Sequence, residues 1–354
     1  KMGYQLDEER PGYRYSFFFC FNSLRIIQIV QGLSAEIYKE MNSINDIYSV
    51  LRAGIYAIAL CVLVSCNGGT NTKTIAGNDD LKSGTIHISV DESFKPIIDS
   101  QIRVFMSQFP EAVIIPHYKA EADCLRDLLN DSIRMVIVTR GLSEQEVKSL
   151  KDTLRFTPPW GQIATDAISV IVNNKSQDSL FTMGEIRSLM KGTSGYKLNP
   201  VLDGNAATST VRFMIDSVLK GQPLSPEVTA AKTSQGVIDY VAQNEHAIGF
   251  LGVSWIGNPD DPQQLAFLSK VRVASIEARD DPGKFIKPYQ ANIATKRYPM
   301  VRGLYYIVKE NYSGLGRGFT NFLKSEKGQL IFQRAYLVPS NMQFTIRSAQ
   351  IKEE

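Results

Sequence analysis

After its first 83 residues, the chain alternates between the two-residue apolar period of strands and the 3.6-residue period of helices. Ile86, Ile88 and Val90 alternate with polar residues and predict a first strand. An apolar face over residues 94–109 then predicts a helix. The same patterns predict a second strand over 112–115, a helix over 121–130 and a third strand over 135–138. A strand-helix repeat of this kind indicates an α/β fold with a mainly parallel sheet.

A second group of elements follows, and one of its helices begins with three successive hydroxyl residues. Apolar residues at 211, 214, 215, 218 and 219 define that helix, and Gly221 provides its C-terminal stop. The other predicted strands are 164–174, 247–253 and 303–310, and the other predicted helices are 183–192, 235–244 and 319–337.

The N-terminal part contains a 12-residue apolar run, 53–64, that ends just before Ser65 and Cys66. A helix that spans a bilayer needs roughly 20 apolar residues, so this run has the length of a signal-peptide core instead. Its end resembles a bacterial lipobox, in which the cysteine is lipidated, although a buried helix that ends in cysteine is the alternative. We therefore predict an upstream segment 1–40 of unclear status, a signal peptide 41–65, lipidation at Cys66 and a flexible tether over 66–83.

Composition limits the classes of function. The chain has 354 residues, of which 44% are hydrophobic, so it is long enough for more than one lobe. The net charge is only +3 and no basic cluster stands out, which argues against nucleic acid as a partner. The four cysteines and three histidines show no metal-ligand spacing, so we expect neither a metal nor another cofactor.

Three predicted strand-to-helix junctions share the same chemistry, at 91–94, 139–140 and 208–210. In parallel α/β sheets, such junctions lie at the carboxyl ends of the strands, where ligands bind. A helix N-terminus favours an anion, and hydroxyl groups add hydrogen-bond donors there without adding charge. Each junction alone is also compatible with ordinary helix capping, and Arg212 with a surface pair to Asp216. Together the three junctions predict an anion site.

Several segments resemble those of one family: "VDESF", "VTRGLSEQE", "TSTVRFMIDSVL", "HAIGFLGV", "YPMVRGLYYIVK" and "FLKSEKGQLIFQRAYLVP". They are similar to the substrate-binding proteins of phosphate ABC transporters, the PstS type of the type II periplasmic binding proteins. The resemblance extends from Gly84 to about Pro339. It implies a two-lobed fold with two crossover strands, lobe 1 comprising 84–168 with 290–350 and lobe 2 comprising 169–289.

The resemblance also implies a function. A chain of this family captures inorganic phosphate between its lobes, is not an enzyme, and delivers the ion to the permease subunits of an ABC transporter. With the predicted lipobox, it implies a monomer on the periplasmic side of a bacterial membrane, held there by its lipid anchor only. Two alternatives stay open: a binding protein or sensor for another tetrahedral oxyanion such as sulfate, and, more remotely, a serine hydrolase with Ser93 or Ser209 as nucleophile.

The family's binding residues can be carried over to matching positions. The implied ligands are Ser93, the Phe94 N–H, Thr139, Thr208, Ser209, Thr210, Arg140 and Arg212. The family's central glycine of the Ser-Gly-Thr helix start is Ser209 here, and its preceding arginine aligns with Gly204. Arg140 stands where the family often has the acidic residue that accepts the ligand's proton. Unless Asp91, Glu92 or Asp203 takes that role, sulfate should be rejected only weakly.

Overall fold

The computed structural model describes residues 79–204, 208–258 and 260–341. The predicted upstream segment, the signal peptide, Cys66 and most of the tether lie outside the described residues. The end of the predicted tether is described and is bound to the domain. The Asp79 carboxylate accepts hydrogen bonds from the Tyr312 hydroxyl and from the Leu315 backbone N–H, each at 2.8 Å. Within the described ranges, no helix combines the length and the apolar character that a membrane span requires.

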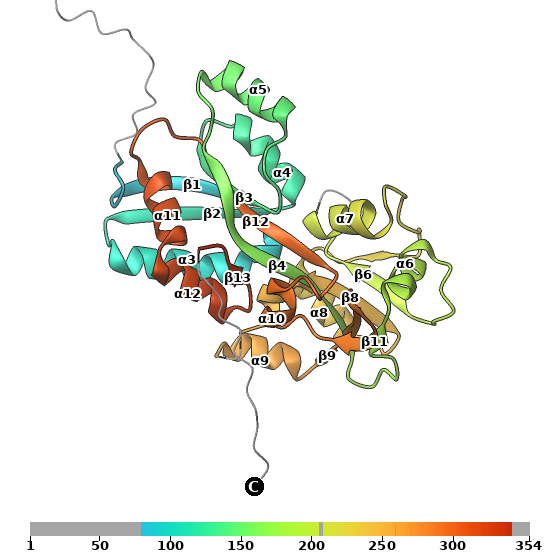
Figure 1. Cartoon of the computed structure of the whole chain (residues 1–354). Coiled ribbons are helices and arrows are strands. Elements are labelled where there is room, and N and C mark those ends of the chain that lie inside the picture. Colours follow the sequence, from blue (N-terminus) through green and yellow to red (C-terminus); the bar gives the residue numbers. More distant parts are fainter. Residues whose placement is uncertain (1–78, 205–207, 259, 342–354) are drawn as a thin grey trace, which may run out of the picture. The chain divides into compact units, whose positions relative to one another are not determined.

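The first half of the main sheet contains the elements predicted at the start of the domain. Its strands are β1 (Gly84–Asp91), β2 (Ala112–Lys119), β3 (Ile133–Val138), β12 (Val301–Val308), the beginning of β4 (Trp160–Asn173) and the short β13 (Val338–Pro339). β1 pairs in parallel with β2 and β3, whereas β12 lies antiparallel between β3 and β4 (Figure 1). The sheet is therefore mixed and not mainly parallel, because the two connecting strands run against their neighbours.

Helices cover both faces of this half. One face carries α3 (Lys95–Gln108), α11 (Leu315–Lys324) and α12 (Glu326–Arg334), and the other carries α4 (Glu121–Arg126), the 3-10 turn η2 (Asp127–Leu129) and α5 (Glu144–Leu154) (Figure 1). The apolar run of β3 is consequently buried on both faces, and Met135, Val136, Ile137 and Val138 have no exposed surface. This confirms the prediction that the run forms a covered strand.

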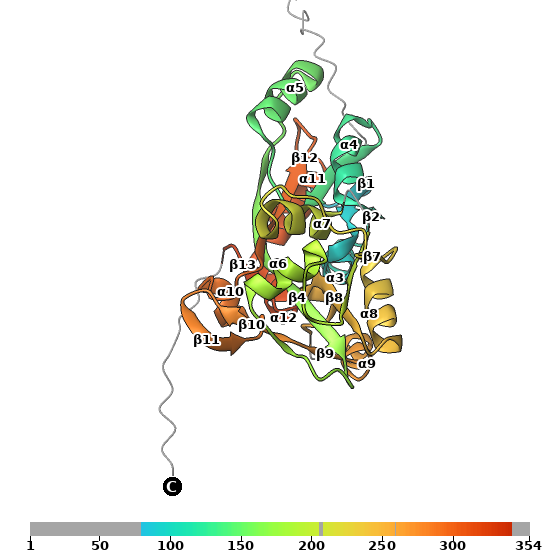
Figure 2. The same ribbon diagram turned by 90° about the vertical axis from the view of Figure 1, so that its right-hand side faces the viewer.

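The second half extends the same sheet from the distal end of β4. Its strands are β8 (Ala247–Gly252), β6 (Asn199–Leu202), β7 (Thr229–Ala230) and β9 (Val271–Val273), and a small separate sheet contains β5 (Leu180–Phe181), β10 (Ser275–Ala278) and β11 (Asp281–Ile286). The helical elements here are α6 (Met183–Lys191), α7 (Ser209–Phe213), the π-helical η3 (Met214–Val218), α8 (Ser234–Gln243), η4 (Val253–Trp255) and α9 (Pro262–Leu268) (Figure 2). α10 (Gln290–Ala294) instead contacts the first half, where its Gln290 donates to the carbonyls of Gln333 and Leu337, each at 2.7 Å.

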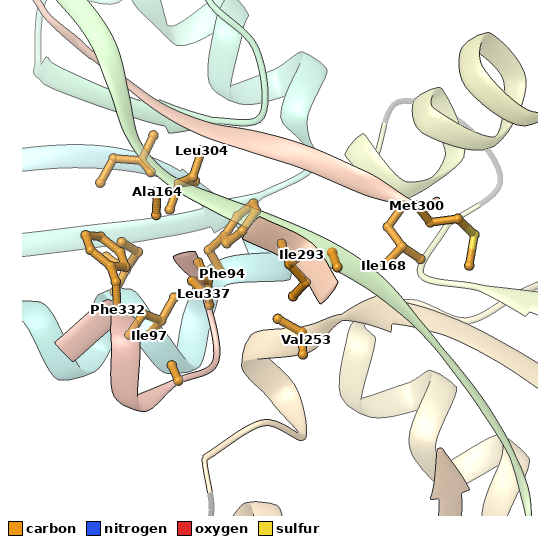
Figure 3. Packing of buried hydrophobic residues seen from close by; sticks show 14 of the residues in the cluster. Phe94, Ile97, Ala164, Ile168, Val253, Ile293, Met300, Leu304, Phe332 and Leu337 are labelled. Atoms are coloured by element: carbon orange, nitrogen blue, oxygen red, sulfur yellow. The ribbon is translucent and has the colours of Figure 1, made fainter. Parts of the chain in front are cut away.

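Strand β4 joins the two halves and changes partner in its middle. Its residues 160–167 pair with β12, and residues 168–172 pair with β8. The change lies at the boundary predicted between lobes 1 and 2. A continuous core runs beneath this crossing: Figure 3 shows Ala164, Leu304 and Phe332 at one end of it and Ile168 and Met300 at the other. Burial of these apolar side chains, at roughly 25 cal/mol per Å², holds the crossing strands in place.

The last predicted helix, 319–337, is in fact two helices. Ser325 has extended backbone angles (φ −70°, ψ 164°) and caps α12 by accepting a hydrogen bond from the Gly328 backbone N–H at 3.4 Å. A Cβ at Gly328 would lie 2.2 Å from the carbonyl oxygen of Phe322, so the turn depends on glycine at this position. The apolar residues on either side of the break, Leu323 and Leu330, are seven residues apart and so share one helical face, which is why the sequence predicts a single helix.

Candidate functional site

The three predicted junctions meet at the carboxyl ends of β1, β3 and β6. The first is η1 (Glu92–Phe94), a 3-10 turn between β1 and α3. Its Ser93 Oγ lies 3.1 Å from Asp203 Oδ2 and 3.3 Å from Ser209 Oγ, which belong to the third junction. Ser93 and Ser209 are completely buried. The two halves of the sheet therefore contact each other through hydroxyl groups.

Each hydroxyl of the run 208–210 has a different partner. Thr208 caps α7, because its Oγ1 accepts a hydrogen bond from the Val211 N–H at 3.2 Å. Thr208 and Thr210 also donate to Asp203, each at 2.9 Å. The middle hydroxyl, Ser209, turns away from this carboxylate and accepts from an arginine of the central strands. One hydroxyl is thus enough for the cap, and the other two belong to a buried polar cluster.

That arginine is Arg302 of β12, which sequence analysis did not select. Its side chain is only 3% exposed. Nε donates to Asp166 Oδ2 on β4 at 2.8 Å, and Nη1 donates to Ser209 Oγ at 2.9 Å and to Thr210 Oγ1 at 3.4 Å. Nη2 is buried and has no hydrogen-bond partner within the described structure. A buried guanidinium with a free N–H group is a strong anion ligand.

Two neighbours shape the space around this guanidinium. Its central carbon lies 5.1 Å from the centre of the Phe94 ring, close enough for a cation–π contact. A Cβ on Gly252, at the end of β8, would stand 3.1 Å from Nη2, so this glycine leaves the guanidinium room. Phe94, predicted as a backbone ligand, therefore also supports the cluster through its ring.

A second arginine connects the first and second halves through Glu121, at the start of α4. Arg212 of α7 donates to Glu121 Oε2 at 2.6 Å and to Thr139 Oγ1 at 2.7 Å. Thr139 in turn donates to Glu121 Oε1 through its hydroxyl at 2.5 Å and its backbone N–H at 2.9 Å. Burial alone would raise the pKa of Glu121, but the hydrogen bonds from Arg212 and Thr139 outweigh it and hold that pKa below its ordinary value. Arg212 also lies 3.7 Å from Asp216, the surface partner considered above.

Arg140 does not join these groups. Its guanidinium forks onto the Glu146 carboxylate of α5, at 2.7 and 2.8 Å, and its side chain is 33% exposed. Glu146 is also the second member of the predicted capping box with Ser143, which the structure confirms. The expected bidentate contact of Arg140 is therefore made with a carboxylate of its own helix cap, and its role toward a ligand stays a prediction.

The cluster contains more acidic than basic groups. Asp91, Glu121, Asp166 and Asp203 are all buried, against the two arginines Arg212 and Arg302. Burial raises the pKa of Asp91 to about 7, against the opposing attraction of Arg302. The Asp91 Oδ1 accepts the Ser93 N–H at 3.0 Å, while its Oδ2 has no partner in the described structure. An anion that enters this cluster must therefore bring protons or meet protonated carboxyl groups.

Most of the predicted donors are bonded to carboxylates of the chain itself. The Asp203 carboxylate accepts hydrogen bonds from Ser93, Thr208 and Thr210. The Glu121 carboxylate accepts hydrogen bonds from Thr139 and Arg212. A further carboxylate, Glu92, accepts the Ser234 N–H at 3.1 Å and the Ser234 hydroxyl at 2.8 Å, at the N-terminus of α8. In this structure, carboxylate oxygens of the chain itself therefore accept the hydrogen bonds of most of the predicted donors.

The groups needed for hydrolysis are not assembled around the hydroxyls. Ser93 and Ser209 face Asp203 and Arg302, and no described histidine forms a hydrogen bond with either. His87 and His117 instead pair with each other, 2.9 Å apart, on β1 and β2. Within the described ranges, no group of three histidine, cysteine or acidic residues is placed to hold a metal ion.

Two relatives match over most of the chain and are named as binding proteins. The phosphate-binding protein PstS of Staphylococcus saprophyticus is 20% identical over 317 residues, which is 85% of this chain and 93% of the relative. PstS of Staphylococcus aureus strain USA300 is 21% identical over 296 residues, 79% of this chain and 84% of the relative.

Solved structures show the same fold. A candidate phosphate ABC transporter substrate-binding protein from Clostridium perfringens, determined with bound phosphate, superposes with a TM-score of 0.60 at 18% identity, covering 72% of this chain and 99% of the other. An ABC-type phosphate transport receptor from Vibrio cholerae reaches 0.52 at 19% identity, covering 72% and 100%. These similarities establish a mixed α/β fold of the type II periplasmic binding protein kind.

Family membership follows from a broader match. A family model described as the PBP superfamily domain matches residues 76–327, well over half of the chain and nearly all of the described domain. The relatives are binding proteins and transport receptors, not enzymes. The chain therefore belongs to the PBP superfamily, and PstS phosphate-binding proteins are among its distant relatives.

Proposed function

We propose that this chain captures inorganic phosphate and delivers it to the permease of an ABC transporter. The observation that carries the proposal is the buried guanidinium of Arg302. Its Nη1 donates to the buried hydroxyls of Ser209 and Thr210, Ser209 Oγ lies 3.3 Å from Ser93 Oγ, and its buried Nη2 has no partner in the described structure. Hydroxyls, a guanidinium and backbone N–H groups together are a typical donor set for a tetrahedral oxyanion. The names of the relatives support phosphate as that anion.

Binding would exchange one set of oxygen atoms for another. Phosphate oxygens would take the hydrogen bonds that Ser93 and Thr210 now make to Asp203, at 3.1 and 2.9 Å. The Asp203 carboxylate would then accept a hydrogen bond from the O–H group that phosphate carries near neutral pH. Asp91, whose pKa is raised to about 7 by burial, would remain beside the ligand partly protonated. In this way the cluster would admit an anion despite its excess of carboxyl groups.

We further propose that the two halves of the sheet act as lobes that close on the ligand. β4 and β12 would serve as the crossover strands, and the change of partner between residues 167 and 168 supports this division. Two groups of polar contacts connect the halves beside the cluster, Glu92 with Ser234 and Arg212 with Glu121. Their charges and hydroxyls are placed to stabilise a closed arrangement, and rotation about the crossover strands would open it.

The hydroxyl contacts provide a first test. We expect Ser209→Ala and Thr210→Ala each to weaken phosphate binding by about 1.5–3 kcal/mol, the range for a hydrogen bond to a charged group. Folding should persist because Thr208 still caps α7. Thr233→Ala is the matched control, since it removes the capping hydroxyl of α8, which bonds to the Gly236 N–H and not to the cluster. Calorimetry that finds full affinity in both cluster variants would place the ligand elsewhere.

The membrane attachment remains a proposal from the sequence. We propose that the mature chain begins at a lipidated Cys66 and stays on the outer side of a bacterial membrane. Cys66→Ala should then yield a protein that fractionates as soluble or unprocessed material, because an acyl anchor supplies the hydrophobic attachment. Detergent partitioning of wild type and variant measures this. Equal membrane association of the two would rule out the lipid anchor.

Another oxyanion is the alternative ligand. The sequence predicts weak rejection of sulfate unless a carboxylate reaches the ligand. Asp203 lies within hydrogen-bond distance of three hydroxyls of the cluster, and this supports strong selection for a protonated anion. We therefore favour phosphate over sulfate. A sensor without a transporter would bind in the same way, and neighbouring genes for a permease and an ATPase would distinguish the two roles.

A further inference from the structure

A cavity lies away from the polar cluster. Its volume is about 370 Å³, within the range of small-molecule sites. The wall is formed by η4, α9, β9, the connection between β11 and α10, and Tyr336, which follows α12. None of the residues that line it belongs to the cluster around Arg302. The site proposed for phosphate therefore does not explain this cavity.

The wall of the cavity is mainly apolar. Its aliphatic part is formed by Val253, Ile256, Leu265, Leu268, Val271 and Val273. Two tyrosines complete it, Tyr289 and Tyr336, whose ring centres are 6.4 Å apart and whose planes are inclined by 57°. Leu265 and Tyr289 are 50% and 54% exposed, so part of this apolar wall is in contact with water. Apolar surface that stays in contact with water favours a ligand with an apolar body.

Two cations lie on the same wall, and no carboxylate does. Arg272 donates to the Ser176 carbonyl at 2.7 Å, and the Nζ of Lys287 has no hydrogen-bond partner among the described residues. Neither side chain has a described Asp or Glu oxygen within 4.0 Å, and no Asp or Glu lines the cavity. The cavity therefore combines apolar walls with uncompensated positive charge.

Tyr336 and Gly257 lie next to each other on the cavity wall. Tyr336 has a φ of 64°, in the left-handed region that bulky residues rarely adopt. A Cβ on Gly257 would stand 2.8 Å from the Cβ of Tyr336, so glycine is required opposite it. The left-handed conformation of Tyr336 ends α12, where the Leu337 N–H donates to the Phe332 carbonyl at 3.1 Å. Here it places the Tyr336 ring on the wall of the cavity.

We propose that this cavity binds a small amphiphilic anion, a monocarboxylate with an aliphatic or aromatic body. The apolar body lies against the aliphatic wall and the two tyrosines, and the carboxylate lies near Lys287 and Arg272. The ligand is a free small molecule and not a membrane lipid. This site is separate from the phosphate site and does not depend on it.

Calorimetric titration of the full chain with octanoate tests the proposal, with 1-octanol as the neutral match. We expect saturable one-site binding of octanoate that phosphate does not displace, and weaker binding of octanol. Lys287→Gln combined with Arg272→Gln should weaken octanoate binding about tenfold while leaving octanol unchanged. Lys284→Gln is the matched control, because Lys284 lies on β11 outside the cavity wall, 3.7 Å from Asp281.

A second variant fills the cavity. Val273→Trp should abolish the binding of both compounds, and an unchanged thermal midpoint would show that folding is intact. The proposal fails if octanoate does not saturate the chain, if the double variant binds it as wild type does, or if phosphate competes with it. It also fails if the chain binds anionic phospholipid vesicles through Lys287 and Arg272 but does not bind free octanoate. That result would indicate a surface that contacts membranes.

Discussion

Replacement of Arg302 by methionine is expected to abolish phosphate binding, with a loss of at least about 10³-fold. Its guanidinium makes hydrogen bonds to Asp166, Ser209 and Thr210, and it holds the one buried N–H group that has no partner in the cluster. Removal of one member of a buried hydrogen-bonded charge pair costs 2–5 kcal/mol or more in binding. Methionine keeps an unbranched apolar stem and removes the guanidinium group, with its charge and its donors. Calorimetry with phosphate measures the loss.

Arg302→Met alone could fail to bind because it does not fold, and a double variant excludes this explanation. Asp166 is completely buried, so without Arg302 its charge would be unpaired and the fold would lose about 3–5 kcal/mol. The pair Arg302→Met with Asp166→Asn removes both charges and should fold near normally while still failing to bind phosphate. Arg297→Met is the matched control, because its guanidinium pairs with Asp280 and Asp281 outside the cluster. A double variant that binds phosphate with wild-type affinity would show that Arg302 is not a ligand.

The second large effect is expected at Asp203. In Asp203→Asn, an amide replaces the carboxylate that we propose as acceptor of the ligand's proton. Phosphate should bind more weakly and sulfate more tightly, because the amide N–H groups can donate to an oxygen that carries no proton. We expect the ratio of the two affinities to fall by about 10²- to 10³-fold. Competition titrations at pH 7 measure both affinities in one experiment.

Asp91→Asn distinguishes between the two candidate acceptors. Asp91 Oδ2 is also unpartnered, and burial raises the pKa of this carboxyl to about 7. If Asp91 accepts the proton, its variant loses the selection against sulfate and Asp203→Asn keeps it. If neither variant changes the ratio, the proposed origin of the selectivity is wrong, and the phosphate site would have to select its ligand through the arginines alone.

Helix capping explains why the hydroxyl junctions can be found from the sequence. A cap depends on residues within one turn, so Ser143 with Glu146, and Thr208 before an apolar helix, are visible as local patterns. The strands that precede these junctions are equally clear, because the apolar residues of β1 and β3 are buried as their spacing predicts. The meeting of the three junctions then follows from the parallel pairing of β1 with β3 and of β6 with β8.

The charged partners of these hydroxyls could not be found in the same way. Arg302 and Asp166 each interrupt an apolar strand, and they become a pair only because β12 and β4 place them opposite one another. The available signal was the presence of one charged residue, an arginine or an aspartate, inside each of two otherwise apolar strands. Glu121 reads as an ordinary acidic residue in a first helical turn, and its contact with Arg212 joins segments 91 residues apart. Such contacts depend on register and tertiary structure, which apolar periodicity does not encode.

The short elements of the second half were also beyond the sequence pattern. β5, β7 and β9 contain only two or three residues each, too few to show a period. The helix 211–219 was predicted with its buried face, but its left-handed end begins one residue early, at Lys220 with a φ of 53°, before Gly221. Its last part is π-helical, a local widening that spacing alone does not reveal.

A calorimetric titration of the full wild-type chain with phosphate at pH 7, alone and with a hundredfold excess of sulfate, tests the central claim most directly. The arrangement of Arg302, Asp203 and the buried hydroxyls predicts one phosphate per chain and an affinity that the sulfate leaves nearly unchanged. The assignment of this cluster as a phosphate site would be contradicted if the chain binds no phosphate, or if the excess of sulfate displaces the bound phosphate.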